Sequence, residues 1–336
     1  MDSEIVESAA DRWLTQGWTV APGLIGPEEV EAALAEVLTL VPAPDEYHRD
    51  PAAARRSRGL PESSAPDPGV LPEGPDFRGE QFRWEQIFPF VSCPTLNRLC
   101  VHGEIVSFVR RCLGTPDIRL YQAGLDVKYA GDTIYDQPLH LDANHSYLPA
   151  SRDRRWRHVE GFLYLTDVSE TTGATRFVSL GESESALDGQ VAEPWPSRQL
   201  EPVRSFLVPG RVISQESAKH IYDRAEPAVG EKGSFMAYGP QVLHRGAEIS
   251  DHGAWRVILN VSFRTAEQEW VGFHTWQPNS TKRGWREFVA GRTPDELGLV
   301  GFPAPGHPIW DERMIAETAE RYPGLDVQPW REALAS

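Results

Sequence analysis

Cysteine is scarce in this chain. Its 336 residues include only three cysteines, Cys93, Cys100 and Cys112, and their spacing lacks the close pairing that is typical of zinc sites. This scarcity excludes a cysteine-based metal centre, and it fits a protein that folds in a reducing compartment.

Long hydrophobic runs and a targeting signal are also missing. No apolar stretch approaches the roughly 20 residues that a membrane-spanning helix needs. Residues 1–8 are acidic and have neither the basic start nor the apolar centre of a signal peptide. We therefore predict a soluble, cytoplasmic protein that does not enter a membrane.

Positive charge is in deficit. The chain has 33 lysines and arginines against 49 aspartates and glutamates, so its formal net charge is −16. A phosphate backbone would be repelled by this charge, which argues against a nucleic-acid partner. The hydrophobic content of 40% and the charged content of 24% are typical of a globular protein.

The first third of the chain has helical periodicity. Apolar residues at helical spacing predict a helix that begins near Ser3, a second that starts at Pro27, and a third over residues 94–113. Residues 41–76 lie between the second and third helices and are rich in proline, so we interpret them as a long loop. This loop is either a solvated connector or a lid over a site.

From residue 117 the period changes to that of strands. In residues 255–263, for example, apolar side chains alternate with polar ones. Many short strands separated by Gly and Pro turns indicate a sandwich or barrel. We predict a mainly β protein with flanking helices and a jelly-roll core. It is a single domain over 1–336, in which 1–116 supplies N-terminal helices and a lid-like loop, 117–265 the core, and 266–336 a C-terminal extension.

The strongest chemical signal is a His-x-Asp pair, His140 and Asp142. Residues i and i+2 of a strand point to the same face, so the pair offers one nitrogen and one oxygen ligand side by side. His244 follows about a hundred residues later. Two histidines and one carboxylate are the ligand set of non-haem Fe(II) oxygenases. The alternative is a core histidine beside a turn-forming carboxylate, and His158 is one of several competitors for the third ligand position.

Arg256 is a candidate for binding a carboxylate. It alternates with Trp255 and Val257, so it shares a strand face with Asn260 and Ser262. A guanidinium holds a carboxylate through two parallel hydrogen bonds. The alternative is an ordinary arginine that faces solvent.

Taken together, these motifs resemble the phytanoyl-CoA dioxygenase family of Fe(II)/2-oxoglutarate oxygenases. The segments that carry the resemblance are residues 17–25, His140-Leu-Asp142, residues 170–181, His244-Arg-Gly246 and Arg256. One departure from the family pattern lies at the end of the third segment. Relatives commonly have Pro-Gly-Ser-His there, whereas this chain reads Ser-Leu-Gly-Glu-Ser over residues 179–183.

The resemblance implies a double-stranded β-helix in which His140, Asp142 and His244 bind Fe(II). It also implies that Arg256 pairs with the distal carboxylate of 2-oxoglutarate, with O2 as the second co-substrate. Lys128 and Gln122 are further candidates for binding 2-oxoglutarate. No catalytic residue is implied beyond the metal ligands.

The implied reaction is hydroxylation of a C–H bond of a small molecule, with release of succinate and CO2. Asp142 fills the position that related halogenases leave open for a halide. The alternatives are desaturation or cyclisation by the same class of enzyme, a non-catalytic jelly-roll protein that binds a ligand, and a metal-dependent hydrolase or isomerase of cupin type. The basic segment 152–158 is either a contact for an anionic substrate or a solvated loop.

Overall fold

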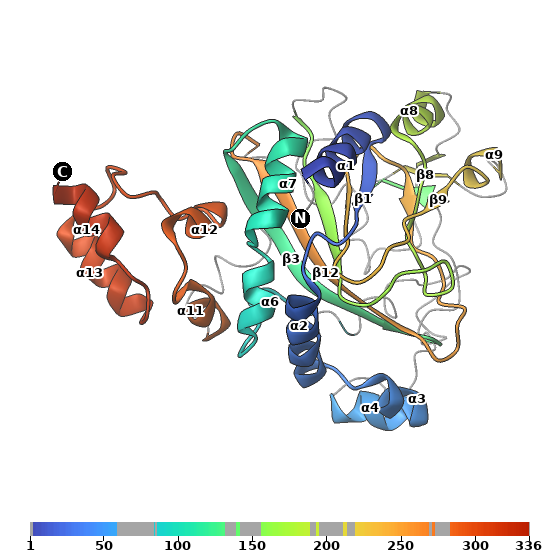
Figure 1. Ribbon diagram of the computed structural model, residues 1–336, viewed down its shortest axis with the longest axis horizontal. Helices are drawn as coiled ribbons and strands as arrows, with labels where there is room; N and C mark the ends of the chain where they lie inside the picture. The colour runs from blue at the N-terminus through green and yellow to red at the C-terminus, as the bar shows by residue number, and fades with distance from the viewer. Residues whose placement is uncertain are drawn as a thin grey trace.

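The computed structural model describes residues 3–58, 84, 86–131, 139–141, 156–188, 193–194, 211–213, 219–268, 271–272 and 283–335. Within these residues the core consists of two antiparallel sheets of six strands each (Figure 1).

The larger sheet has the order β1-β10-β5-β12-β3-β2. Its strands are β1 (Trp18–Ala21), β2 (Gln86–Ile87), β3 (Ile118–Tyr129), β5 (Glu160–Tyr164), β10 (Phe235–Tyr238) and β12 (Trp255–Thr265). The long strands β3 and β12 pair from Trp255↔Tyr129 to Thr265↔Ile118. A bulge shifts this register between Ser262 and Phe263, which leaves Tyr121 without a paired residue on β12.

The second sheet has the order β7-β8-β4-β11-β6-β9. Its strands are β4 (Leu139–His140), β6 (Arg176–Phe177), β7 (Glu193–Pro194), β8 (Arg211–Ile213), β9 (Glu226–Pro227) and β11 (His244–Arg245). All of these strands are two or three residues long.

The strand order confirms the predicted jelly roll. If β3, β4, β5, β6, β9, β10, β11 and β12 are counted from first to eighth, the two sheets have the orders 1-8-3-6 and 2-7-4-5. Consecutive strands therefore pass from one sheet to the other, except the fourth and fifth, which are neighbours in the second sheet, as in a jelly roll. The remaining strands extend the edges of this core.

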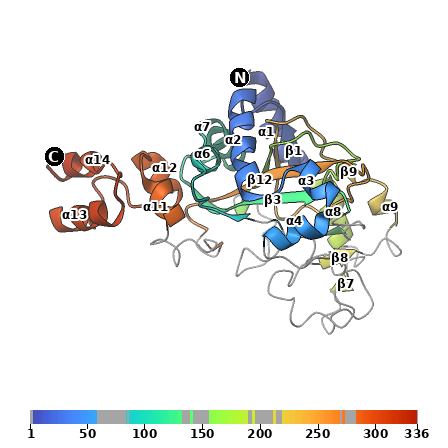
Figure 2. The same cartoon turned by 90° about the horizontal axis from the view of Figure 1, so that it is seen from below.

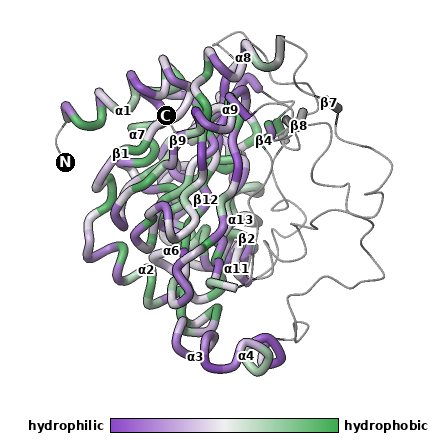
Figure 3. Tube along the Cα trace, turned by 90° about the vertical axis from the view of Figure 1, so that its right-hand side faces the viewer, coloured by the Kyte–Doolittle hydropathy of each residue, from purple (hydrophilic) through white to green (hydrophobic). Residues whose placement is uncertain are grey.

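Helices cover one face of the larger sheet. They are α1 (Ser3–Gln16), α2 (Pro27–Leu40), α6 (Pro94–Leu99) and α7 (Gly103–Leu113). Figure 2 shows them on one side of β3 and β12, with β7 and β8 on the other. Hydrophobic and hydrophilic residues alternate along these helices (Figure 3), because only one face of each helix is buried.

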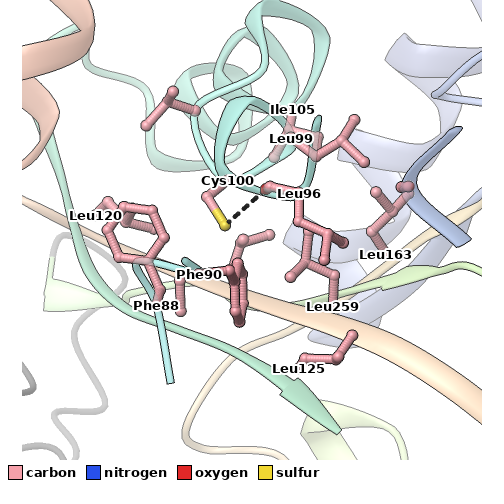
Figure 4. Packing of buried hydrophobic residues seen from close by; sticks show 14 of the residues in the cluster. Phe88, Phe90, Leu96, Leu99, Cys100, Ile105, Leu120, Leu125, Leu163 and Leu259 are labelled. Carbon is pink, nitrogen blue, oxygen red and sulfur yellow. Dashed lines mark hydrogen bonds between the residues drawn. The ribbon is translucent and has the colours of Figure 1, made fainter. Parts of the chain in front are cut away.

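Successive side chains of β12 point to opposite faces of the larger sheet, so one set joins the hydrophobic core and the other does not. Val257, Leu259 and Val261 belong to the large hydrophobic cluster beneath the helices. Figure 4 shows this cluster, in which the labelled residues include Leu96, Leu99, Cys100, Leu125, Leu163 and Leu259. The intervening residues of β12 therefore face the second sheet, and Ile258 packs there with Phe177 and Met236.

Two predictions of local structure were wrong. The predicted loop contains two helices, α3 (Pro44–Arg49) and α4 (Pro51–Ser57), and each begins at a proline, whose fixed φ suits the first helical position. Residues 59–76 of that loop lie outside the described residues. The predicted helix over 94–113 is divided, because His102 is extended and its Nδ1 accepts a hydrogen bond from the Glu104 N–H at 3.2 Å, which caps a new helix.

The C-terminal residues form an α-helical extension. Its helices are α11 (Arg283–Val289), α12 (Pro294–Leu299), α13 (Glu312–Arg321) and α14 (Gln328–Ala335). The ring of Phe288 lies 4.6 Å from that of Phe88, next to β2, and Trp285 lies 6.2 Å from the same ring. Trp285 therefore packs the extension onto the core, whereas α13 and α14 lie farther from the sheets (Figure 1). Two short helices, α8 (Leu180–Asp188) and α9 (Lys219–Tyr222), connect strands of the second sheet.

None of the helices formed by the described residues is long and apolar enough to cross a bilayer.

A substitution at Gly161, on β5, would test how closely the larger sheet is packed. A Cβ at this position would lie 2.2 Å from Cζ of Phe235 and 2.7 Å from the carbonyl oxygen of Val261. We expect Gly161→Ala to lower the free energy of unfolding by about 2 kcal/mol, because the buried ring has to move. Gly181→Ala is the control, since nothing lies within 4 Å of its Cβ and alanine favours the helix. Urea unfolding of both variants measures the difference, and equal stabilities would contradict the packing.

Candidate functional site

The structure brings two of the predicted metal ligands together. His140 on β4 and His244 on β11 are directly paired across neighbouring antiparallel strands. Their ring centroids are 4.5 Å apart. Two residues that are 104 positions apart in the sequence therefore present their imidazoles side by side.

The surroundings of His244 define its tautomer. Nδ1 lies 3.0 Å from the carbonyl oxygen of Val242, and a carbonyl can only accept, so Nδ1–H is the donor. The ring is 5% exposed, and it lies between Phe177 and Tyr238 at centroid distances of 5.6 and 4.7 Å. A neutral imidazole that donates from Nδ1 keeps its lone pair on Nε2, the arrangement found in metal-binding histidines.

Asp142 lies outside the described residues. It follows His140 by two positions, so its place beside the histidines stays a prediction. Among the residues that the structure describes, no group of three or more His, Cys, Asp or Glu side chains is arranged to hold a metal ion.

The competing histidines are in other environments. His158 lies 3.2 Å from the carboxylate of Glu160, and His220, His252 and His307 are exposed. His145 and His274 lie outside the described residues.

Arg256 and Lys128 form a buried cationic pair. They are direct cross-strand partners of β12 and β3, on the face turned toward the second sheet, and each is 4% exposed. Arg256 donates from Nη1 to the carbonyl oxygen of Gly173, and its Nε has no hydrogen-bond partner. Burial lowers the pKa of the Arg256 guanidinium, and the charge of Asp126 acts against this shift. Adjacent buried cations favour binding of an anion.

Gln122 lies far from this pair. It is on the same face of β3, opposite Ser262, and six residues from Lys128, or roughly 20 Å along an extended strand. Its Oε1 is buried and has no hydrogen-bond partner.

Sequence analysis missed a buried network around Glu160. This residue is 1% exposed, and its carboxylate accepts hydrogen bonds from the Tyr121 hydroxyl and, at 2.7 Å, from Oγ of Ser262. Nε2 of His158 lies 3.2 Å from Oε1 of the same carboxylate. A carboxylate in the otherwise apolar stretch 159–165 was the available signal. Because buried carboxylates require partners, this signal pointed to a network.

Removal of this carboxylate should destabilise the fold. In Glu160→Ala, the hydrogen bonds from Tyr121 and Ser262 to the carboxylate are lost and a cavity is left in the interior, so we expect a loss of about 3 kcal/mol in the free energy of unfolding. Glu170→Ala is the matched control, because Glu170 is 62% exposed and pairs with Arg176 at the surface. Thermal unfolding of both variants tests this, and a Glu160 variant as stable as the control would contradict the network.

Solved structures with a similar chain trace were found. One is the non-haem α-ketoglutarate-dependent epimerase SnoN from nogalamycin biosynthesis, at 16% identity and a TM-score of 0.47, covering 79% of this chain and 84% of that one. Another is the carbocyclase SnoK from the same biosynthesis, at 17% identity and a TM-score of 0.46, covering 83% and 91%. A third is AviO1 from Streptomyces viridochromogenes Tue57, at 14% identity and a TM-score of 0.44, covering 78% and 96%. A comparison with curated protein sequences gave no match.

The family comparison is more decisive. The model of the phytanoyl-CoA dioxygenase (PhyH) family matches residues 13–256, which is more than half of the chain and includes every predicted site residue. The family uses Fe(II), 2-oxoglutarate and O2, and the paired histidines and the buried cations described above fit the metal and the anionic co-substrate. The chain therefore belongs to the phytanoyl-CoA dioxygenase family and is an enzyme of the non-haem iron, 2-oxoglutarate-dependent oxygenase class.

Proposed function

We propose that this enzyme hydroxylates a C–H bond of a small molecule and releases succinate and CO2. His140, Asp142 and His244 are the proposed iron ligands, and Arg256 and Lys128 hold the distal carboxylate of 2-oxoglutarate. The observation that carries the proposal is the cross-strand pairing of His140 with His244 in one sheet, combined with the buried Arg256–Lys128 pair in the other.

The ligand set supports iron. Two imidazoles from neighbouring strands and a carboxylate two residues after the first would hold Fe(II), because non-haem Fe(II) oxygenases use this set of ligands. Bound together, iron and 2-oxoglutarate supply the activation of O2. The protein contributes a fixed orientation of His244 through Val242, Phe177 and Tyr238. Asp142 leaves no position for a halide, which favours hydroxylation, with desaturation or cyclisation as the alternatives.

Burial supports 2-oxoglutarate at the cationic pair. Arg256 and Lys128 are each 4% exposed, and a buried cation favours an anionic partner, which the distal carboxylate would supply. The unpartnered Nε of Arg256 gives such a carboxylate a donor.

The basic segment gives less support to an anionic substrate than the sequence suggested. Arg157 is 3% exposed, and its Nη1 donates to the carbonyl oxygen of Leu14 at 3.4 Å. His158 lies against Glu160. The remaining arginines of the segment, Arg152, Arg154 and Arg155, lie outside the described residues. We therefore propose a small-molecule substrate without assigning it a negative charge on this ground.

Iron binding and turnover are tested together. We expect the protein, loaded anaerobically with Fe(II) and 2-oxoglutarate and then exposed to O2, to form succinate. His140→Ala should lose bound iron and succinate formation, because it removes a ligand, whereas the exposed His252→Ala should retain both. Metal analysis and succinate quantification are the measurements. Full iron binding in His140→Ala would overturn the ligand assignment.

The co-substrate site has its own test. We expect Arg256→Gln to weaken 2-oxoglutarate binding by about 30- to 100-fold, which corresponds to the loss of a charged hydrogen bond of roughly 2–3 kcal/mol. Arg111→Gln is the control, since Arg111 is 48% exposed and pairs with Glu7. Anaerobic calorimetric titration with 2-oxoglutarate gives both affinities. An unchanged affinity in Arg256→Gln would remove Arg256 from the site.

A further inference from the structure

We propose that the barrel-facing side of β3 carries a substrate site for a neutral molecule rich in hydroxyl groups. Two acceptor oxygens, Oε1 of Gln122 and Oδ1 of Asp126, form this site. The inference rests on the proposed function, because it names the class of substrate that the same barrel would oxidise.

Both oxygens are buried and have no hydrogen-bond partner. A buried acceptor without a donor destabilises the fold by about 1–3 kcal/mol, and native proteins satisfy nearly all such groups. Two of them on one strand therefore need an explanation. A ligand that donates hydrogen bonds supplies the missing partners.

The two residues share one face of β3. Gln122 and Asp126 are separated by four positions, or about 13 Å, and Gly124 between them adds no side chain. Gly124 pairs with Asn260 of β12, and Gln122 pairs with Ser262. Gln122, Asp126 and Asn260 are each partly exposed, although both strands lie inside the sheet. Solvent therefore reaches this face of β3.

The site lies between the two parts of the proposed active site. Arg256 pairs with Lys128 two positions beyond Asp126, so the co-substrate end of the barrel adjoins Asp126. At the other end, Tyr238 contacts His244 and is the cross-strand partner of Glu160. Gln122 and Asn260 are therefore on the side of the barrel that also holds the histidines.

Asn260 adds a third polar group to this face. Its Oδ1 lies 2.9 Å from Oγ of Ser262, and that hydroxyl also lies 2.7 Å from Oε2 of Glu160. The Ser262 hydroxyl has one proton, so when it donates to Glu160 the Asn260 oxygen remains as a further acceptor on this face. A hydroxyl group, which both donates and accepts, matches the mixture of amide and carboxylate groups.

The charges favour a neutral ligand. The charge of Asp126 acts on Arg256, so these two groups offset each other. An anionic substrate would meet the carboxylates of Asp126 and Glu160, whereas a cationic one would meet Arg256 and Lys128. Hydroxyl groups satisfy the free acceptors without adding charge.

Binding of matched probes tests the inference. The probes are neutral polyols (glycerol, myo-inositol and methyl glucoside) and charged counterparts (glycerate, glucuronate and glucosamine). Each is titrated, without O2, into the protein loaded with Fe(II) and 2-oxoglutarate, and binding is followed by ligand-observed NMR. We expect a neutral polyol to bind more tightly than its charged counterparts.

Substitutions then locate the binding. Gln122→Leu removes a neutral acceptor and should weaken polyol binding about fivefold, whereas Asp126→Val removes a charged acceptor and should weaken it roughly 10- to 100-fold. Asp126→Asn keeps an acceptor without the charge and should weaken binding less than Asp126→Val does. Gln16→Leu, on the exposed end of α1, is the matched control and should bind the polyol as the unaltered protein does. If Asp126→Val does not fold, Asp126→Ala takes its place.

Several results would overturn the inference. Polyol binding that Gln122→Leu and Asp126→Val leave unchanged would place the ligand elsewhere. If glucosamine bound most tightly and Asp126→Asn abolished this preference, the substrate would be cationic. If glycerate or glucuronate bound most tightly, the substrate would be anionic. A greater effect of Gln122→Leu on 2-oxoglutarate affinity than on polyol affinity would assign Gln122 to the co-substrate. A protein that binds 2-oxoglutarate but none of the probes contradicts this inference alone, whereas one that binds no 2-oxoglutarate contradicts the proposed function.

Discussion

The antiparallel pairing of β3 with β12 is the constraint on which the rest of the molecule depends. One face of this ribbon supplies Leu125, Val257 and Leu259 to the hydrophobic cluster beneath the helices. The opposite face presents Lys128, Arg256 and Asp126 to the second sheet. Because side chains alternate along a strand, the same register positions both the core and the site. The stability of the helical layer and the geometry of the site therefore cannot be changed independently at these positions.

The short strands of the second sheet have a different role. β4 and β11 are two residues long, and they contribute the two paired histidines. So short a strand contributes little to stability through its own hydrogen bonds. Its position follows from the flanking apolar residues, such as Leu139 and Leu243, which pack together in a separate small cluster. The two paired histidines are thus held in place by the packing of the residues that precede them.

The sequence contained enough information for the fold class and for part of the site. Strand periodicity predicted the mainly β core, and the His-x-Asp motif with His244 and Arg256 predicted the candidate ligands. Asp126 and Glu160 were not identified, because their significance depends on which strands pair and in which register, and sequence periodicity contains no such long-range information. The helices α3 and α4 were missed for a local reason. Prolines were interpreted as signs of a loop, whereas Pro44 and Pro51 occupy the first turn of a helix, where proline is tolerated.

The bulge in β3 has a consequence for how this active site can vary. Tyr121 is the extra residue, and its hydroxyl bonds to Glu160, while the next residue, Gln122, is paired with Ser262 on the same interior face. Two consecutive side chains therefore point into the barrel interior, whereas those of a regular strand would point to opposite faces. Deletion of Tyr121 would restore a regular ladder and leave Leu120 and Gln122 on the faces that they already occupy. The bulge therefore adds one side chain to the interior wall without disturbing the register that pairs Arg256 with Lys128.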